Sequence, residues 1–181
     1  MDHVTMNLHL QAYTFAHQFV HDKTVIDAAC GTCFGTMIYS TGARNIIAVD
    51  KDEKAISHGK ELPSFCPIVF EVKDLDKDLL PEADVCVSVE TIEHLNGEGF
   101  FLKNLKTKQL VFTVPIGPLD KRNSFHKMEF LSVDDVIAYV TDCGWPIVTG
   151  VLRESRIATI FEEGPGFSVY NMMLAMAERG K

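Results

Sequence analysis

The segment TVIDAACGTCFGT, residues 24–36, joins a short apolar run to a turn of small residues. The apolar run predicts a buried strand, and the small residues after it predict a sharp turn into a helix. Gly31 and Gly35 lack a Cβ, so the backbone can bend tightly there and a ligand can come close to it. A helix that begins at this turn would present backbone N–H groups to a polar ligand.

A second predicted strand, residues 45–50, ends in an acid. Asp50 lies 19 residues after Gly31. In nucleotide-binding α/β folds, an acid at about this distance from the glycine turn reaches the hydroxyls of a ribose. The two segments together predict that the chain binds an adenosine-containing cofactor on a parallel sheet.

The glycine spacing disfavours a dinucleotide. The dinucleotide fingerprint is G-x-G-x-x-G, whereas this chain has G-x-C-x-G, with Cys33 at the middle position and the last glycine one residue early. The segment resembles motif I of the class I S-adenosylmethionine-dependent methyltransferases, D-x-x-C-G-x-G-x-G, and departs from it at Cys33. The resemblance implies that four residues of this segment line the site of the methionyl end of the cofactor: Asp27, Ala29, Cys30 and Gly31. It also implies that Asp50 binds the ribose hydroxyls.

The resemblance continues along nearly the whole chain. Apolar segments that predict further strands follow in the family's order, at residues 69–72, 83–90 and 109–115. On the same resemblance, the other cofactor-binding residues are Tyr13 in the N-terminal helix, Lys51 beside the ribose acid, Asp74 and Leu75 at the adenine edge, and Glu90.

The length of 181 residues and the alternation of strands and helices predict one α/β domain. We expect a Rossmann-like, seven-stranded and mostly parallel sheet with helices on both faces, completed by a hairpin of segments 147–152 and 168–176. Residues 1–22 form a helical N-terminal segment, and no separate lid is predicted over residues 1–181. Ser132, followed by two acids, predicts the start of the last helix.

The composition disfavours several classes of protein. The net charge of −8 disfavours non-specific nucleic-acid binding. The sequence contains neither an apolar run long enough to span a membrane nor a signal pattern, and its five cysteines form no disulfide scaffold. We therefore expect a cytoplasmic protein without membrane insertion. Cys30 and Cys33 form a C-x-x-C pair, for which the cofactor turn is a better explanation than a redox or zinc site.

Three residues after the fourth predicted strand stand at helical spacing. Glu90, Glu93 and His94 would project from one face if the segment enters a helix. His126 follows the loop after the fifth strand and could return over the same pocket. Two carboxylates with imidazole nitrogens suit Mg²⁺, Mn²⁺ or Fe²⁺. The candidate metal ligands are therefore Glu90, Glu93, His94 and His126. Without a metal, His94 or His126 would be the catalytic base.

The pattern E-x-x-E-H with a later H-x-x-E-F resembles three groups of methyltransferases. These are the small-RNA 3′-terminal 2′-O-methyltransferases, the ubiquinone-pathway O-methyltransferases and, more loosely, glycan-modifying methyltransferases. All three act on hydroxyls. The resemblance implies O-methylation of a small-molecule or saccharide hydroxyl, with S-adenosyl-L-methionine as methyl donor and Mg²⁺ or Mn²⁺ as a possible second cofactor. The alternatives are an RNA-terminus enzyme, a non-catalytic cofactor-binding module and a nicotinamide-dependent reductase.

Overall fold

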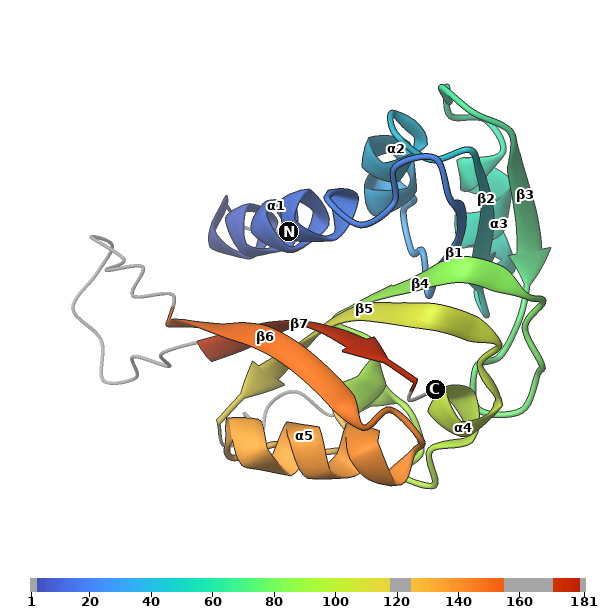
Figure 1. Cartoon of the computed structure of the whole chain (residues 1–181). Helices are drawn as coiled ribbons and strands as arrows, with labels where there is room; N and C mark the ends of the chain where they lie inside the picture. Colours follow the sequence, from blue (N-terminus) through green and yellow to red (C-terminus); the bar gives the residue numbers. More distant parts are fainter. Residues whose placement is uncertain (1–2, 118–124, 155–170, 180–181) are drawn as a thin grey trace.

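A computed structural model describes residues 3–117, 125–154 and 171–179. Seven strands form one sheet in the order β3-β2-β1-β4-β5-β7-β6 (Figure 1). The strands are β1 (Thr24–Ala28), β2 (Asn45–Asp50), β3 (Ile68–Val72), β4 (Ala83–Val89), β5 (Thr107–Ile116), β6 (Ile147–Glu154) and β7 (Asn171–Glu178). Only β7 runs antiparallel to its neighbours. The predicted seven-stranded, mostly parallel α/β sheet with a final hairpin is therefore confirmed.

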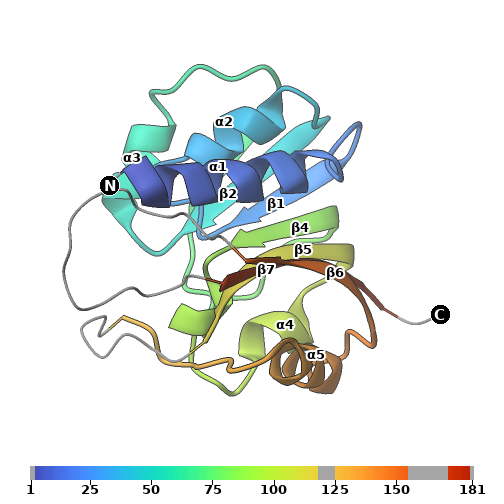
Figure 2. The same ribbon diagram turned by 90° about the vertical axis from the view of Figure 1, so that its left-hand side faces the viewer.

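Helices cover both faces of the sheet, as predicted (Figures 1 and 2). They are α1 (His3–His17), α2 (Phe34–Ser40), α3 (Glu53–Gly59), α4 (Phe100–Asn104) and α5 (Val133–Asp142). The first three lie on one face and the last two on the other. No described helix is both long and apolar enough to cross a bilayer.

Two apolar cores lie on opposite faces because side chains alternate along each buried strand. In β4, Val85 and Val87 join the core under α1, α2 and α3, whereas Cys86 between them joins the core under α4 and α5. Leu110 and Val111 of β5 divide between the two faces in the same way. This pattern explains why the central strands read as continuous apolar runs.

Helix α5 begins where the sequence predicts. The Ser132 side chain accepts a hydrogen bond from the Asp135 amide, and the Asp135 carboxylate accepts one from the Ser132 amide. This capping box satisfies two amides that have no partner within the helix. Gly144, with φ of +95°, follows the helix in a left-handed conformation that suits glycine.

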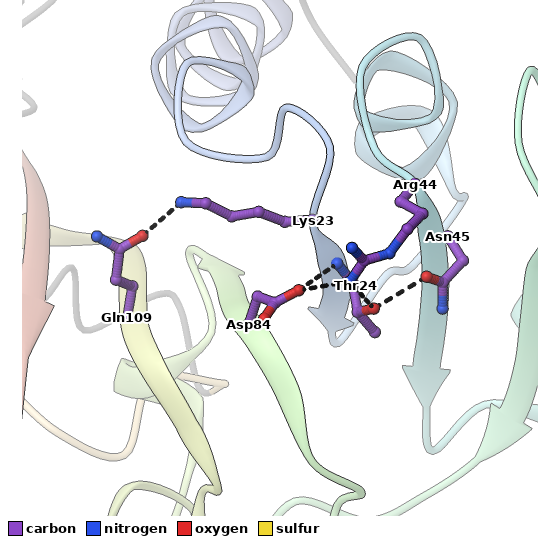
Figure 3. A network of polar contacts seen from close by, with 6 residues as sticks. All are labelled: Lys23, Thr24, Arg44, Asn45, Asp84 and Gln109. Carbon is purple, nitrogen blue, oxygen red and sulfur yellow. Dashed lines mark hydrogen bonds and ion pairs between the residues drawn. The ribbon is translucent and has the colours of Figure 1, made fainter.

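A polar network joins the amino ends of the central strands (Figure 3). The Asp84 carboxylate at the start of β4 accepts from the Thr24 amide and from Arg44, both at 2.9 Å. Three further hydrogen bonds complete the network, from Lys23 to Gln109, from Thr24 to Asn45 and from Arg44 to the Thr24 hydroxyl. The network lies at the opposite ends of these strands from the pocket described below.

The structure departs from the predicted helical segments in two places. The connection between β3 and β4, residues 73–82, contains turns and no helix. The segment after β4 forms a single 3₁₀ turn, η1 (Ile92–His94), instead of a longer helix. Glu90 lies before that turn with φ of +49°, so it does not share a helical face with Glu93 and His94. The expected common face is therefore wrong.

Candidate functional site

A pocket of about 420 Å³ opens at the carboxyl ends of the parallel strands. Ligands of open α/β sheets bind at this edge, beside the point where the strand order reverses, which here lies between β1 and β4. Its lining includes six residues predicted to bind the cofactor: Ala29, Asp50, Lys51, Asp74, Leu75 and Glu90. His94 lines it as well.

The glycine turn is tied to the acid at the end of β2. The Gly31 amide donates to Asp50 Oδ2 at 2.8 Å, and the Asp52 amide donates to Oδ1 at 2.9 Å. Gly31 has φ of +51°, a left-handed conformation that favours glycine. The Gly31 N–H therefore has a partner within the protein. The turn fixes the orientation of the Asp50 carboxylate.

Asp27 lies beneath the turn, where it is almost wholly buried and accepts a hydrogen bond from the Thr36 hydroxyl. Burial raises the pKa of its carboxyl to about 7, the Thr36 hydrogen bond opposes that rise, and the charge of Asp50 adds to it. Tyr13 of α1 lies near enough for burial and the charges of Asp27 and Glu90 to raise its pKa to about 12. Neither Asp27, Tyr13, Cys30 nor Gly31 is among the lining residues of the pocket described above.

Glu90 stands at the pocket wall directly after β4. The Thr113 hydroxyl of the neighbouring strand β5 donates to its Oε1 at 2.9 Å, and the Glu90 amide donates to the same hydroxyl at 3.0 Å. Burial raises the pKa of Glu90 to about 7 despite the Thr113 hydrogen bond. A cation beside this carboxyl would favour its ionised form.

Glu93 is the most unusual group of the site. Its side chain is 0% exposed, and neither carboxylate oxygen has a hydrogen-bond partner. Burial, and then the charge of Glu90, raises its pKa well above the usual value. An ionised carboxylate in such a place is costly unless a cation neutralises it. The geometry therefore leaves Glu93 two states, protonated or paired with a cation.

A backbone contact fixes the tautomer of His94. Its Nδ1 lies 3.0 Å from the Phe125 carbonyl oxygen, which can only accept a hydrogen bond. Nδ1 must therefore carry the proton, and in the neutral ring Nε2 holds the free lone pair. Nε2 lies 3.7 Å from Glu93 Oε1. The nitrogen that can bind a metal or accept a proton is thus the one that faces the buried carboxylate.

The segment after β5 is anchored to the η1 turn. The amides of Lys127 and Met128 both donate to the Glu93 carbonyl, at 2.8 and 3.0 Å. The Lys127 ammonium donates to Asn96 at 3.0 Å and lies 3.6 Å from Asp76. These contacts place the His126 ring 4.7 Å from that of His94, centroid to centroid. These backbone contacts therefore explain why His126 lies beside His94, although His126 is not among the residues that line the pocket.

Three predicted ligands meet as a candidate metal site. Glu93, His94 and His126 each offer one ligand atom, and these atoms lie within 4.8 Å of one another. Burial and the charge of His94 lower the pKa of His126, which favours the neutral form needed for ligation. The structure does not bring Glu90, the fourth predicted ligand, into this group.

Several residues of the site and its surroundings have no sequence signal of their own. Thr113, the partner of Glu90, is found only through the pairing of β4 with β5, in which Val89 lies opposite it. Thr36 lies in the quoted turn segment, and its hydroxyl could have been paired with Asp27 from their spacing. Six further lining residues were missed, namely Lys73, Asp76, Thr91, Leu95, Phe125 and Lys127. Phe125 and Lys127 flank His126, and this adjacency was the one available signal.

Comparison with known proteins finds relatives of the same fold. No family model matches the chain. A probable S-adenosylmethionine-dependent methyltransferase of Mycobacterium tuberculosis, known from two strains, is 28% identical over 161 residues. The match covers 77% of this chain and 58% of the relative, so the chain spans less than two thirds of the length of these curated relatives.

Solved structures share the architecture at low identity. An S-adenosylmethionine-dependent methyltransferase from Mesorhizobium loti superposes with a TM-score of 0.68 at 16% identity, covering 93% of this chain and 98% of that one. Magnesium protoporphyrin IX methyltransferase from Synechocystis, with bound S-adenosylhomocysteine, superposes with a TM-score of 0.70 at 16% identity. The match covers 98% of this chain and 88% of that one. The fold is therefore that of the class I methyltransferases. The relatives' names support the resemblance to this superfamily and its cofactor, while the E-x-x-E-H subgroup stays a prediction.

Proposed function

We propose that the protein is an S-adenosylmethionine-dependent methyltransferase that methylates a hydroxyl of a small molecule or saccharide. The observation that carries the proposal is the pocket at the carboxyl edge of the sheet. The Asp50 carboxylate, held by the Gly31 amide, lies in the same pocket wall as Glu90 and His94. Asp50 would bind the ribose hydroxyls and Leu75 would contact the adenine. Glu90 would face the methionyl end of the cofactor.

The pocket continues past the cofactor residues toward the acceptor side. His94, Leu95 and Phe125 line that part, and the Phe125 side chain is 76% exposed. A non-catalytic cofactor-binding module would need no such space beside the methyl group. This extension supports an enzyme with an open acceptor end.

The charges of the pocket support a small acceptor over an RNA terminus. An RNA-terminus enzyme needs a cationic groove for phosphates. The lining instead mixes both signs, with the bases Lys51, Lys73 and Lys127 beside the acids Asp50, Asp74, Asp76 and Glu90. Lys73 and Lys127 have acidic partners, Glu71 at 3.9 Å and Asp76 at 3.6 Å. The lining therefore lacks the excess of positive charge that a polyanion requires.

Transfer requires an in-line approach of the acceptor oxygen to the sulfonium methyl. The oxygen attacks the methyl carbon, the carbon–sulfur bond breaks, and its electron pair stays on sulfur. In the metal-free protein, His94 Nε2 accepts the hydroxyl proton, because Nδ1 is held by the Phe125 carbonyl. Positioning supplies much of the remaining acceleration, since the methyl group is already electrophilic.

The residues present fit a divalent cation. The buried Glu93 carboxylate lacks any hydrogen-bond partner, and two imidazoles lie beside it. Glu93, His94 Nε2 and His126 would hold Mg²⁺ or Mn²⁺, with open positions for water and the acceptor. A cation there would lower the pKa of a bound hydroxyl and neutralise Glu93.

Calorimetry with S-adenosylhomocysteine tests the proposal. We expect one site per chain with micromolar affinity, because the pocket offers charged partners to both the ribose and the amino-acid end. NADH is the control ligand, since the turn lacks the pyrophosphate-binding glycines. Binding of NADH without binding of S-adenosylhomocysteine would refute the proposal and favour the reductase.

A further inference from the structure

The turn that holds Asp50 contains two cysteine thiols in contact. Cys30 Sγ and Cys33 Sγ lie 3.7 Å apart, and the side chains are 9% and 1% exposed. The Cys33 amide donates to the Cys30 carbonyl at 2.8 Å. This bond closes a four-residue turn, in which the outer Cα atoms lie within about 7 Å. That separation is compatible with a disulfide.

We propose that hydrogen peroxide oxidises Cys30 and Cys33 to a disulfide, and that this disulfide prevents cofactor binding. The inference goes beyond the proposed methyl transfer, although its effect on the cofactor rests on it. The position of the pair, directly between the strand β1 and the helix α2, makes it part of the turn that orients Asp50.

The oxidation balances with a peroxide as the oxidant. The Cys33 thiolate attacks one oxygen of hydrogen peroxide, and a sulfenic acid forms as hydroxide leaves. The Cys30 sulfur then attacks the sulfenic sulfur and loses its proton, and water leaves. Two thiols and one peroxide give one disulfide and two waters.

The environment favours Cys33 as the first sulfur to react. The contact between the two sulfurs lowers the pKa of Cys33, while the same contact and burial raise the pKa of Cys30. Ala29, which precedes Cys30 directly, lines the neighbouring pocket, whereas neither cysteine does.

Closing the disulfide must move the turn. The sulfur–sulfur distance has to fall from 3.7 Å to about 2.05 Å. Cys33 Sγ now packs against α3, where a Cβ on Gly59 would stand only 2.5 Å from it. Gly31, between the two cysteines, donates to Asp50, and the Cys30 amide donates to Val49 of β2 at 2.9 Å. A displaced turn therefore disturbs the carboxylate proposed to bind the ribose.

Peptide mass analysis after peroxide treatment tests the disulfide itself. The tryptic peptide of residues 24–44 contains both cysteines and no others. We expect it to lose two hydrogens and to resist alkylation until dithiothreitol is added. The matched variants are C33S, which should never form the species, and C66S, which should form it as the wild type does, because Cys66 is a free thiol outside the pair. Unreacted or merely over-oxidised thiols in the wild type would overturn the proposal.

Calorimetry on the oxidised and reduced wild type tests the consequence. We expect the oxidised protein to bind S-adenosylhomocysteine at least about tenfold more weakly, with full recovery after reduction. Equal affinities would refute the switch. Failure of the reduced protein to bind would count against the methyltransferase proposal instead, because the mass measurement does not depend on the cofactor.

Discussion

Asp50→Ala is expected to weaken the binding of S-adenosylhomocysteine more than about 100-fold. A hydrogen bond to a charged group contributes about 1.5–3 kcal/mol, and a ribose offers two hydroxyls to this carboxylate. A loss of about 3–6 kcal/mol corresponds to two or more orders of magnitude in affinity. The substitution also removes the acceptor of the Gly31 amide, so the turn loses its tie to β2. Calorimetry gives the affinity, and thermal unfolding checks that the variant folds.

Two control variants test whether the loss of affinity is specific to the Asp50 carboxylate. Asp52→Ala removes the neighbouring acid, whose side chain caps α3 by accepting from the Lys54 amide at 2.9 Å. It should cost about 1 kcal/mol of stability and leave the affinity within about twofold. Asp50→Asn keeps one acceptor oxygen, so its affinity for S-adenosylhomocysteine should lie between those of the wild type and Asp50→Ala. Unchanged affinity in Asp50→Ala would refute the ribose contact.

Glu93→Gln is expected to abolish Mn²⁺ binding while leaving the affinity for S-adenosylhomocysteine within about threefold. The side chain is wholly buried and its carboxylate has no hydrogen-bond partner, so a bound cation would stabilise the charge of this group more than that of an exposed acid. Loss of this charged ligand should weaken Mn²⁺ binding at least about 100-fold. When a chelator keeps both proteins metal-free, the variant should be at least as stable as the wild type, because glutamine cannot ionise in the buried site.

Mn²⁺ titration followed by electron paramagnetic resonance and by thermal unfolding measures this effect. Glu98→Gln makes the same chemical change at an exposed position in the next loop and should behave as wild type. A wild-type protein that shows no Mn²⁺ binding, or a Glu93→Gln variant that keeps it, would contradict the metal site. His94 Nε2 would then be the proton acceptor without a metal.

The sheet was predictable because its signals are local. Apolar runs such as residues 45–50 mark strands wherever both faces are buried, and Ser132 marks a helix start through its own hydrogen bond. The position of Asp50 was predictable because the lengths of the strand, turn and helix before it leave little freedom in where the second strand ends. Its hydrogen bond to Gly31 was not predictable, since it depends on how the turn folds back on β2.

The candidate metal site was only partly predictable. Glu93 and His94 are neighbours in sequence, but the left-handed backbone at Glu90 separates that residue from them, and no local pattern reports such a φ. His126 reaches the site because the amides of Lys127 and Met128 bind the Glu93 carbonyl. Contacts between segments more than 30 residues apart depend on the completed sheet, in which β4 and β5 are neighbours.

The most direct measurement of the central claim is a crystal structure of the wild-type protein with S-adenosylhomocysteine. The account predicts that both ribose hydroxyls lie within hydrogen-bond distance of the Asp50 carboxylate, that the adenine lies against Leu75, and that the sulfur faces the side of the pocket lined by Glu90 and His94. A ligand bound at another place, or no bound ligand at saturating concentration, would contradict it.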